Sequence, residues 1–282
     1  MSKVTAEMVK TLRERTGVGM SKCKAALDEA GGDMDRAIDN LRKAGMATAV
    51  KKEGRESNEG LIHFAESDDG IAVVELACET DFVAQNEKFK EFLNALCQET
   101  LKAKPASVEE LVKLPHSGAP GMSIEEVRAQ LVLSLGENIQ IKRVAVIPKE
   151  GGRSYGVYSH MGGRIFVLIE LGGDTDQGAL AKDIAMHTAA EAPEYLSPED
   201  VPADIIEREK EVAKGQIGDK PEYVIDKILQ GKLNSFYEQL CLSHQKFVKD
   251  PSMTITKLLE EAGKKAGQPI QLVQFLRWQI GG

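Results

Sequence analysis

Apolar side chains recur at helical spacing in three short stretches within the first 45 residues of the chain. Each stretch follows a residue type that caps helix N-termini, and a glycine comes after it. The capping residues are Thr5, Ser21 and Asp33, and the glycines are Gly17, Gly31 and Gly45. We therefore predict three amphipathic helices of roughly ten residues that close around one small core, a module at residues 1–45. The polar residues 46–60 are typical of a linker.

The loop between the first two predicted helices, Gly17-Val18-Gly19-Met20, holds two apolar side chains among glycines. Two interpretations stay open. Val18 and Met20 either fill the core of the module or form an exposed docking patch, because loops mostly run over protein surfaces.

Runs of β-forming residues begin after the predicted linker. Residues 61–65 and 71–77 are separated by Asp68-Asp69-Gly70, which predicts a β-hairpin. The elements expected after it are a helix at 81–103, a helix near 123–135 and a strand at 139–147.

The sequence repeats itself at an offset of 95 residues. Val74 to Asp81 aligns with Ile169 to Asp176, and both segments indicate an apolar strand that runs through an acidic corner into a helix. The second copy predicts strands at 155–160 and 164–171, a helix at 176–190 and a closing strand at 270–280. We therefore predict an α+β fold with a duplicated core of antiparallel sheets and packed helices. Subdomain N spans 61–148, and subdomain C spans 149–202 and 241–282.

Residues 203–240 interrupt the second copy and are predicted to form a helical hairpin. Apolar residues lie at helical spacing along both arms, and Gly215 to Pro221 make the turn. The arms either pack on each other or present an apolar stripe for self-association or another protein. The second alternative predicts a homodimer through residues 203–240.

Composition excludes several classes of protein. The chain has 282 residues, 42% hydrophobic and 28% charged, with 26 Gly and 10 Pro, which excludes disordered, collagenous and fibrous proteins. No apolar run approaches the roughly 18 residues of a membrane-spanning helix, and residues 1–7 lack the apolar core of a signal peptide. We expect a cytoplasmic protein without a membrane partner. The four cysteines form no C-x-x-C pair, which favours reduced, buried thiols.

The net charge of −8 is uneven along the chain. Residues 1–55 hold 12 Lys and Arg against 8 Asp and Glu, which leaves 24 against 36 for the rest. A net charge of +4 spread over all faces of a small module is weak support for nucleic-acid binding. We therefore expect no direct nucleic-acid partner.

The sequence contains no familiar catalytic or cofactor motif. Walker-type, dinucleotide-binding, H-E-x-x-H and G-x-S-x-G patterns are all missing. The five histidines are far apart, and Cys241 with His244 makes one C-x-x-H pair without a second ligand pair, which argues against zinc. We therefore predict no enzyme active site, no metal and no cofactor.

One corner of the repeat carries an aromatic residue. Thr80 and Thr175 are both placed to cap the helix that follows, but Phe82 aligns with Gln177, so the fold of the unit does not require an aromatic side chain there. Phe82 is either a hydrophobic staple onto its own helix or a wedge offered to a partner.

Several segments resemble the bacterial elongation factor Ts family. They are Leu12-Arg13-Glu14-Arg15-Thr16-Gly17, Cys23-Lys24, Ala26-Leu27, Cys78-Glu79-Thr80-Asp81-Phe82-Val83-Ala84, Gly136-Glu137-Asn138-Ile139, Ile184-Ala185-Met186-His187 and Phe247-Val248-Lys249-Asp250-Pro251. They span nearly the whole chain in the order expected for the family. Two features depart from it: the stretch between Pro105 and Gly121 is longer than in many relatives, and the chain stops at Gly282, where many members add a helical module.

The resemblance implies a guanine nucleotide exchange factor for the GTPase elongation factor Tu, with an N-terminal module similar to ubiquitin-associated (UBA) domains and a coiled-coil hairpin. It implies that Asp81 and Phe82, within the segment Thr80 to Val83, enter the GTPase near its magnesium site, where the metal belongs to the partner. Further implied contacts are Arg13, Val18, Gly19, Met20, Met186 and His187. An alternative, resting on residues 5–45 alone, is a UBA-like protein-binding adaptor without exchange activity.

Overall fold

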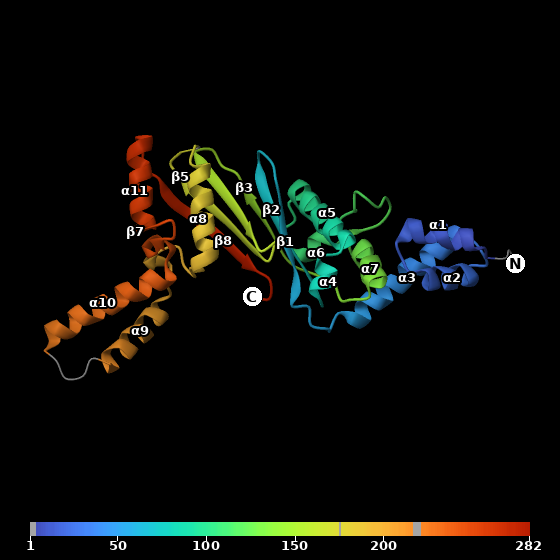
Figure 1. Cartoon of the computed structure of the whole chain (residues 1–282), viewed down its shortest axis with the longest axis horizontal. Coiled ribbons are helices and arrows are strands. Elements are labelled where there is room, and N and C mark those ends of the chain that lie inside the picture. The colour runs from blue at the N-terminus through green and yellow to red at the C-terminus, as the bar shows by residue number, and fades with distance from the viewer. Residues whose placement is uncertain (1–3, 175, 217–220) are drawn as a thin grey trace. The chain divides into compact units, whose positions relative to one another are not determined.

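A computed structural model gives the fold of residues 4–174, 176–216 and 221–282 (Figure 1). The chain forms two compact units. The first unit consists of Met1–Lys149, Gly162–Arg164 and Gln279–Gly282, and the second consists of Glu150–Met161 and Ile165–Trp278. Both combine helices with small antiparallel sheets, so the predicted α+β class is confirmed.

Three helices begin the first unit: α1 (Ala6–Thr16), α2 (Met20–Glu29) and α3 (Met34–Lys52). Thr5 and Asp33 cap α1 and α3 as predicted, since each side chain accepts a backbone N–H hydrogen bond from three residues ahead, at 3.2 and 3.0 Å. The prediction for Ser21 is wrong, because α2 already starts from the carbonyl of Gly19 and has no side-chain cap.

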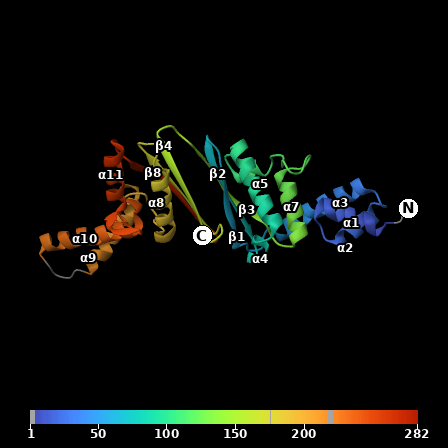
Figure 2. The same cartoon turned by 45° about the horizontal axis from the view of Figure 1, so that its top comes forward.

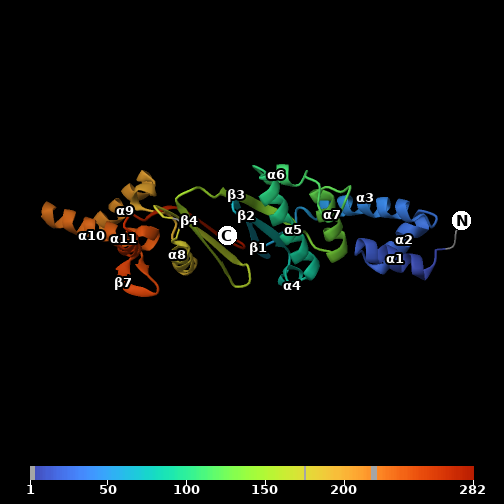
Figure 3. The ribbon, with the colours of Figure 1, turned by 90° about the horizontal axis from the view of Figure 1, so that it is seen from above.

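Helix α3 is longer than predicted. It passes through Gly45, which was predicted to end it, so residues 46–52 are helical and not a linker. Packing against α7 (Ile124–Leu135) explains the difference (Figure 3). A Cβ atom on Gly45 would lie only 3.2 Å from the carbonyl oxygen of Ala129, so the missing side chain permits a close approach of the two helices.

The N-terminal helices are joined to the rest of the first unit by hydrogen bonds. Lys22 Nζ donates to the carbonyl of Leu133 at 2.8 Å. The carbonyl of Gly17 accepts from Ser134 Oγ at 2.7 Å and from Lys88 Nζ at 3.1 Å. Leu133 also packs into the small core of the three helices. These contacts fix the N-terminal helices on α7 and on the start of the helix α5 (Glu87–Ala103).

The first sheet has three antiparallel strands in the order β1-β2-β3. They are β1 (Glu59–Glu66), β2 (Gly70–Cys78) and β3 (Gln140–Pro148). The predicted hairpin and return strand are therefore confirmed. Strand β2 is central and is buried along its whole length, and its pairing with β3 shifts at a bulge between Glu75 and Leu76.

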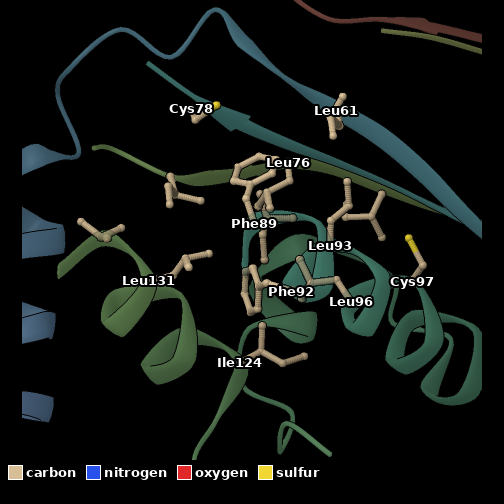
Figure 4. Packing of buried hydrophobic residues seen from close by; sticks show 14 of the residues in the cluster. Leu61, Leu76, Cys78, Phe89, Phe92, Leu93, Leu96, Cys97, Ile124 and Leu131 are labelled. Atoms are coloured by element: carbon tan, nitrogen blue, oxygen red, sulfur yellow. The ribbon is translucent and has the colours of Figure 1, made fainter. Parts of the chain in front are cut away.

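The single helix predicted over 81–103 is two helices, α4 (Asp81–Ala84) and α5 (Glu87–Ala103). Asn86 starts α5 by accepting the N–H of Lys88 on its side chain at 3.0 Å. Helix α5 packs on β1 and β2 (Figure 2). Figure 4 shows its buried side chains, including Phe89, Leu93 and Leu96, gathered against the sheet. A short helix, α6 (Val108–Leu111), and α7 complete the connection to β3.

The second unit repeats this arrangement. Its sheet has the order β4-β5-β8, and α8 packs on β4 and β5. The elements are β4 (Arg153–His160), β5 (Ile165–Gly172), α8 (Gly178–Glu191) and β8 (Gln271–Gln279). In both units the second hairpin strand is central and the return strand lies beside it. The 95-residue offset places the start of β2 on the start of β5.

The second corner differs from the first. Helix α8 begins at Gly178, later than predicted, and Gln177 at its N-cap makes no side-chain capping hydrogen bond. Thr175, which was predicted to cap this helix, lies outside the described residues. The two corners are therefore related in sequence, but their helices start differently.

The end of the second unit contains elements that the sequence did not predict. They are η1 (Pro198–Asp200), η2 (Leu242–His244), β6 (Lys246–Phe247), β7 (Asp250–Thr254) and α11 (Ile255–Ala266). Strands β6 and β7 pair antiparallel, and Ile255 and Leu259 of α11 join the core that α8 covers.

The predicted insertion is a helical hairpin of α9 (Ala203–Gly215) and α10 (Glu222–Leu240). Ala213 and Leu229 form a buried apolar cluster, and the partly buried Ile225 and Ile228 pack against it, so the two arms pack on one another, which supports the first alternative. Residues 217–220 of the predicted turn lie outside the described residues. A homodimer through the hairpin stays a prediction.

Candidate functional site

The corner between β2 and α4 presents Phe82 to solvent. Thr80 has extended backbone angles and its hydroxyl accepts the N–H of Val83 at 3.4 Å, so the predicted helix cap is confirmed. Val83 is half-buried and packs on the core of the unit, whereas Asp81 is exposed and the side chain of Phe82 is 84% exposed. The structure therefore rules out Phe82 as a staple, and the corner offers an aromatic ring at its surface.

Glu137, which directly follows the C-terminal end of α7, holds this corner by hydrogen bonds. Helix α7 ends at Gly136, whose left-handed conformation (φ 81°) turns the chain toward the corner. One carboxylate oxygen of Glu137 accepts the N–H groups of Glu79 and Thr80 at 3.1 and 3.0 Å. The other oxygen accepts the Thr80 hydroxyl at 2.6 Å. Sequence reasoning missed this role, because Glu137 lies far from the corner in the chain.

A second carboxylate closes the same contact in the opposite direction. The Glu79 carboxylate accepts the N–H of Asn138 at 2.6 Å and forms a longer ion pair with Arg55 at 3.4 Å. Asn138 is fully buried, and its side-chain amide donates to the carbonyls of Glu53 and Arg55 at 3.3 and 2.8 Å. The corner, the end of α7 and the end of α3 are therefore linked by one hydrogen-bonded network.

Asp81 brings a negative charge to the exposed side of the corner. Its charge acts on Arg164, whose guanidinium is paired with Glu59. The pKa of Arg164 is raised, first by the hydrogen bond that its guanidinium donates to Glu59 and also by the charge of Asp81. The exposed face thus combines an aromatic ring, a carboxylate and a nearby ion pair.

The N-terminal helices hold four residues that the resemblance implies as partner contacts, and three of them are exposed. Arg13 and Gly19 are exposed, and the side chain of Met20 is 43% exposed. A hollow beside them is lined by Ala6, Lys10, Arg13, Glu14, Gly17, Met20 and Lys88. Val18 is fully buried in the core of the three helices, so its side chain is not at the surface beside this hollow, and the contact implied for it stays a prediction. Of the two loop side chains, one fills the core and the other faces solvent.

Helix α8 separates the last two implied residues. Met186 is half-buried, but His187 is fully buried. The ring of His187 accepts the N–H of Val248 on Nδ1 at 3.3 Å, and its Nε2 lies 3.0 Å from Gln245 Oε1, which makes Nε2 the protonated nitrogen. Burial lowers the pKa of His187, partly offset by the Gln245 hydrogen bond. The His187 ring is therefore held inside the second unit, and the contact that the resemblance implies for it stays a prediction. The sequence signal for this burial is Ile184, an apolar residue one helical turn before His187.

The thiols are free and buried, as the scattered cysteines predict. Burial raises the pKa of Cys78 and of Cys97 to about 12. Within the described ranges, no group of three or more His, Cys, Asp or Glu side chains could hold a metal ion. None of the helices in the described part of the chain has both the length and the apolar character that crossing a membrane requires.

Comparisons with known proteins agree across the whole chain. A family model described as Elongation factor TS matches residues 79–282, starting at the Thr80 corner. The chain is 51% identical to elongation factor Ts of Protochlamydia amoebophila over 281 residues, which is 100% of both chains. It is 44% identical to elongation factor Ts of Chlamydia trachomatis serovar L2 and of Chlamydia muridarum, each again over 100% of both chains.

Proposed function

The chain belongs to the elongation factor Ts family and has the role of a translation elongation factor, and we propose that it performs this role as the guanine nucleotide exchange factor of elongation factor Tu, with Phe82 as its wedge. The observation that carries the proposal is the 84% exposure of Phe82 on a corner that is otherwise held by hydrogen bonds. A free aromatic side chain on a fixed backbone is typical of a binding hot spot.

The proposed mechanism needs no covalent chemistry. Phe82 inserts into the GTPase near its magnesium site and displaces the groups that hold the metal and phosphates. The Asp81 carboxylate adds repulsion toward the phosphate charge. The factor and GDP then oppose each other's binding, and reciprocity requires that incoming nucleotide displaces the factor. The metal belongs to the GTPase in this mechanism.

We further propose that Arg13, Gly19 and Met20 dock on the GTPase and that Met186 lies at a second contact. The first three are supported by their exposure beside one hollow. At the second contact, buried His187 supports the segment that exposes Val248, whose side chain is 39% exposed. The UBA-like character of α1 to α3, the coiled-coil character of α9 and α10, and a cytoplasmic location belong to the same proposal.

Release of fluorescent GDP from elongation factor Tu tests the function, with and without this protein. Phe82→Ala should slow the stimulated release on the order of 30-fold, since a hot-spot aromatic contributes ~2 kcal/mol or more at an interface. The matched control is Val50→Ala, which shortens another apolar side chain of the first unit with 68% exposure and should leave release unchanged.

Three outcomes decide the proposal. No stimulation by the unchanged protein would reject exchange activity. Binding to the GTPase without faster release would favour the adaptor. A Phe82→Ala protein with full activity would show that the wedge lies elsewhere.

A further inference from the structure

We propose that Glu137 is a positioning residue for nucleotide exchange: it fixes the Thr80 corner in the orientation that presents Phe82. This inference rests on the proposed function, because it assigns Glu137 a role only through the wedge. Glu137 itself is half-buried behind the corner, and its carboxylate is engaged by the corner's own backbone and hydroxyl groups.

Helix α4 cannot fix Phe82 without help. It has four residues, Asp81–Ala84, and a helix of that length has no stability in isolation, because its nucleation cost is not recovered. Its direction must come from the residues that start it. The Thr80 hydroxyl is that start, and the hydroxyl hydrogen is donated to Glu137 while its oxygen accepts the N–H of Val83.

The hydrogen bonds to Glu137 restrict both the position and the orientation of Thr80 at the corner. Two backbone N–H groups converge on one carboxylate oxygen and a hydroxyl on the other, so shifting or turning Thr80 breaks at least one of them. Bonds to a carboxylate are stronger than bonds between neutral groups. The reverse bond, from the Asn138 N–H to Glu79, ties the same two segments together a second time. Loss of Glu137 therefore loosens the corner without separating the segments.

A double-mutant cycle between Glu137 and Phe82 tests the inference, read as the GDP-release rate at saturating concentrations of this protein. Glu137→Ala should lower that rate by roughly tenfold and change the half-maximal concentration much less. In a Phe82→Ala background the same substitution should change the rate by less than about twofold, because the group that Glu137 positions is already gone.

Glu110→Ala is the matched control. Glu110 also uses its carboxylate to accept a backbone N–H, that of Ala106 at 2.9 Å, in the same unit but at α6. This variant should leave both the saturating rate and the half-maximal concentration unchanged. Glu137→Gln keeps one oxygen for the two N–H groups and loses the second acceptor, so it should lie between the unchanged protein and Glu137→Ala. It carries the same cycle if Glu137→Ala does not fold.

The outcomes separate this inference from the function on which it rests. If Phe82→Ala alone leaves release unchanged, the wedge is wrong. If Phe82→Ala slows release but the effects of Glu137 and Phe82 multiply fully in the double variant, the wedge stands and the positioning role is wrong. A rate loss that follows the unfolded fraction in thermal melting would also overturn it, since Glu137 would then be purely structural.

Discussion

Replacing Gly45 tests whether close packing of α3 on α7 sets the position of the N-terminal helices. A Cβ atom at this position would lie 3.2 Å from the carbonyl oxygen of Ala129 and 3.3 Å from its carbonyl carbon. These atoms are backbone and cannot rotate away as a side chain would. Gly45→Val adds two further methyl groups at the same place, so the two helices must separate.

The expected magnitude follows from two opposing contributions. Replacing glycine inside a helix recovers about 0.5 kcal/mol of conformational free energy for a β-branched residue. Overpacking costs typically ~1–3 kcal/mol, and backbone contacts place Val at the upper end of that range. We expect Gly45→Val to lower the free energy of unfolding by about 2 kcal/mol. Gly45→Ala should be nearly neutral, because the two contributions are similar in size.

Urea unfolding and GDP release on the same proteins provide the measurement. Ala44→Val is the control, since Ala44 lies on the exposed side of α3 and gains the same side chain without a packing partner. Separating α3 from α7 also moves Arg13 and Met20 relative to the Phe82 corner, so Gly45→Val should need a higher concentration for half-maximal release. Equal unfolding free energies and equal release for Gly45→Val and Ala44→Val would refute the packing argument.

Two further predictions concern pH and the hairpin. Burial lowers the pKa of His63, His116 and His187 below the ordinary 6.5, so the unfolded chain takes up protons first as pH falls. The three neutral histidines therefore contribute fully to the free energy of unfolding above about pH 6.5, and each contribution falls below that pH by at most about 1.4 kcal/mol per pH unit. Urea unfolding at pH 8, 7, 6 and 5 should show the free energy of unfolding falling toward low pH, and His187→Gln should make that fall smaller. A free energy of unfolding that does not change with pH would contradict this. Replacing residues 203–236 by a short Gly-Ser linker should leave the second unit folded, since the Leu240 carbonyl still accepts the N–H groups of Glu194 and Tyr195. If the predicted homodimer exists, sedimentation should show a dimer for the full chain and a monomer for this variant. The same number of subunits in both proteins excludes dimerisation through the hairpin.

The strands were predictable because their signals are local, and the duplication was predictable because both copies keep the same pattern in the sequence. Alternation and continuous apolar runs fixed both hairpins within a few residues, and the 95-residue offset aligned β2 with β5. The missed elements depend on tertiary contacts or on weaker local cues. The conformational freedom of Gly45 predicts that a helix ends there. In this chain, however, Gly45 lies inside a helix, and its missing side chain leaves space for the backbone of Ala129. The break before Asn86 is a local cap inside a segment that otherwise has helical spacing throughout.

The site shows the same limit at the level of single side chains. The repeat indicated that Phe82 is not required by the fold, but whether an aromatic residue beside a cap is buried depends on what surrounds it. His187 is the opposite case, since a residue implied as a partner contact is buried and accepts the N–H of Val248. In both cases the residue type marked a position worth attention, but whether the side chain is exposed or buried could be read only from the packed structure.

The segments Cys78 to Ala84 and Gly136 to Ile139 resemble the family independently in sequence, but they form one structural feature. The first supplies an exposed ring on a four-residue helix, and the second supplies the carboxylate that accepts hydrogen bonds from Thr80 at the start of that helix. In the proposed mechanism Phe82 must keep its direction while it pushes against the GTPase, so we expect it to need more support than the local helix provides. The positioning proposal accounts for the separation of Glu137 from Thr80 in the sequence, because the support then comes from a different element, α7, which is anchored in the core through Ile124 and Val132.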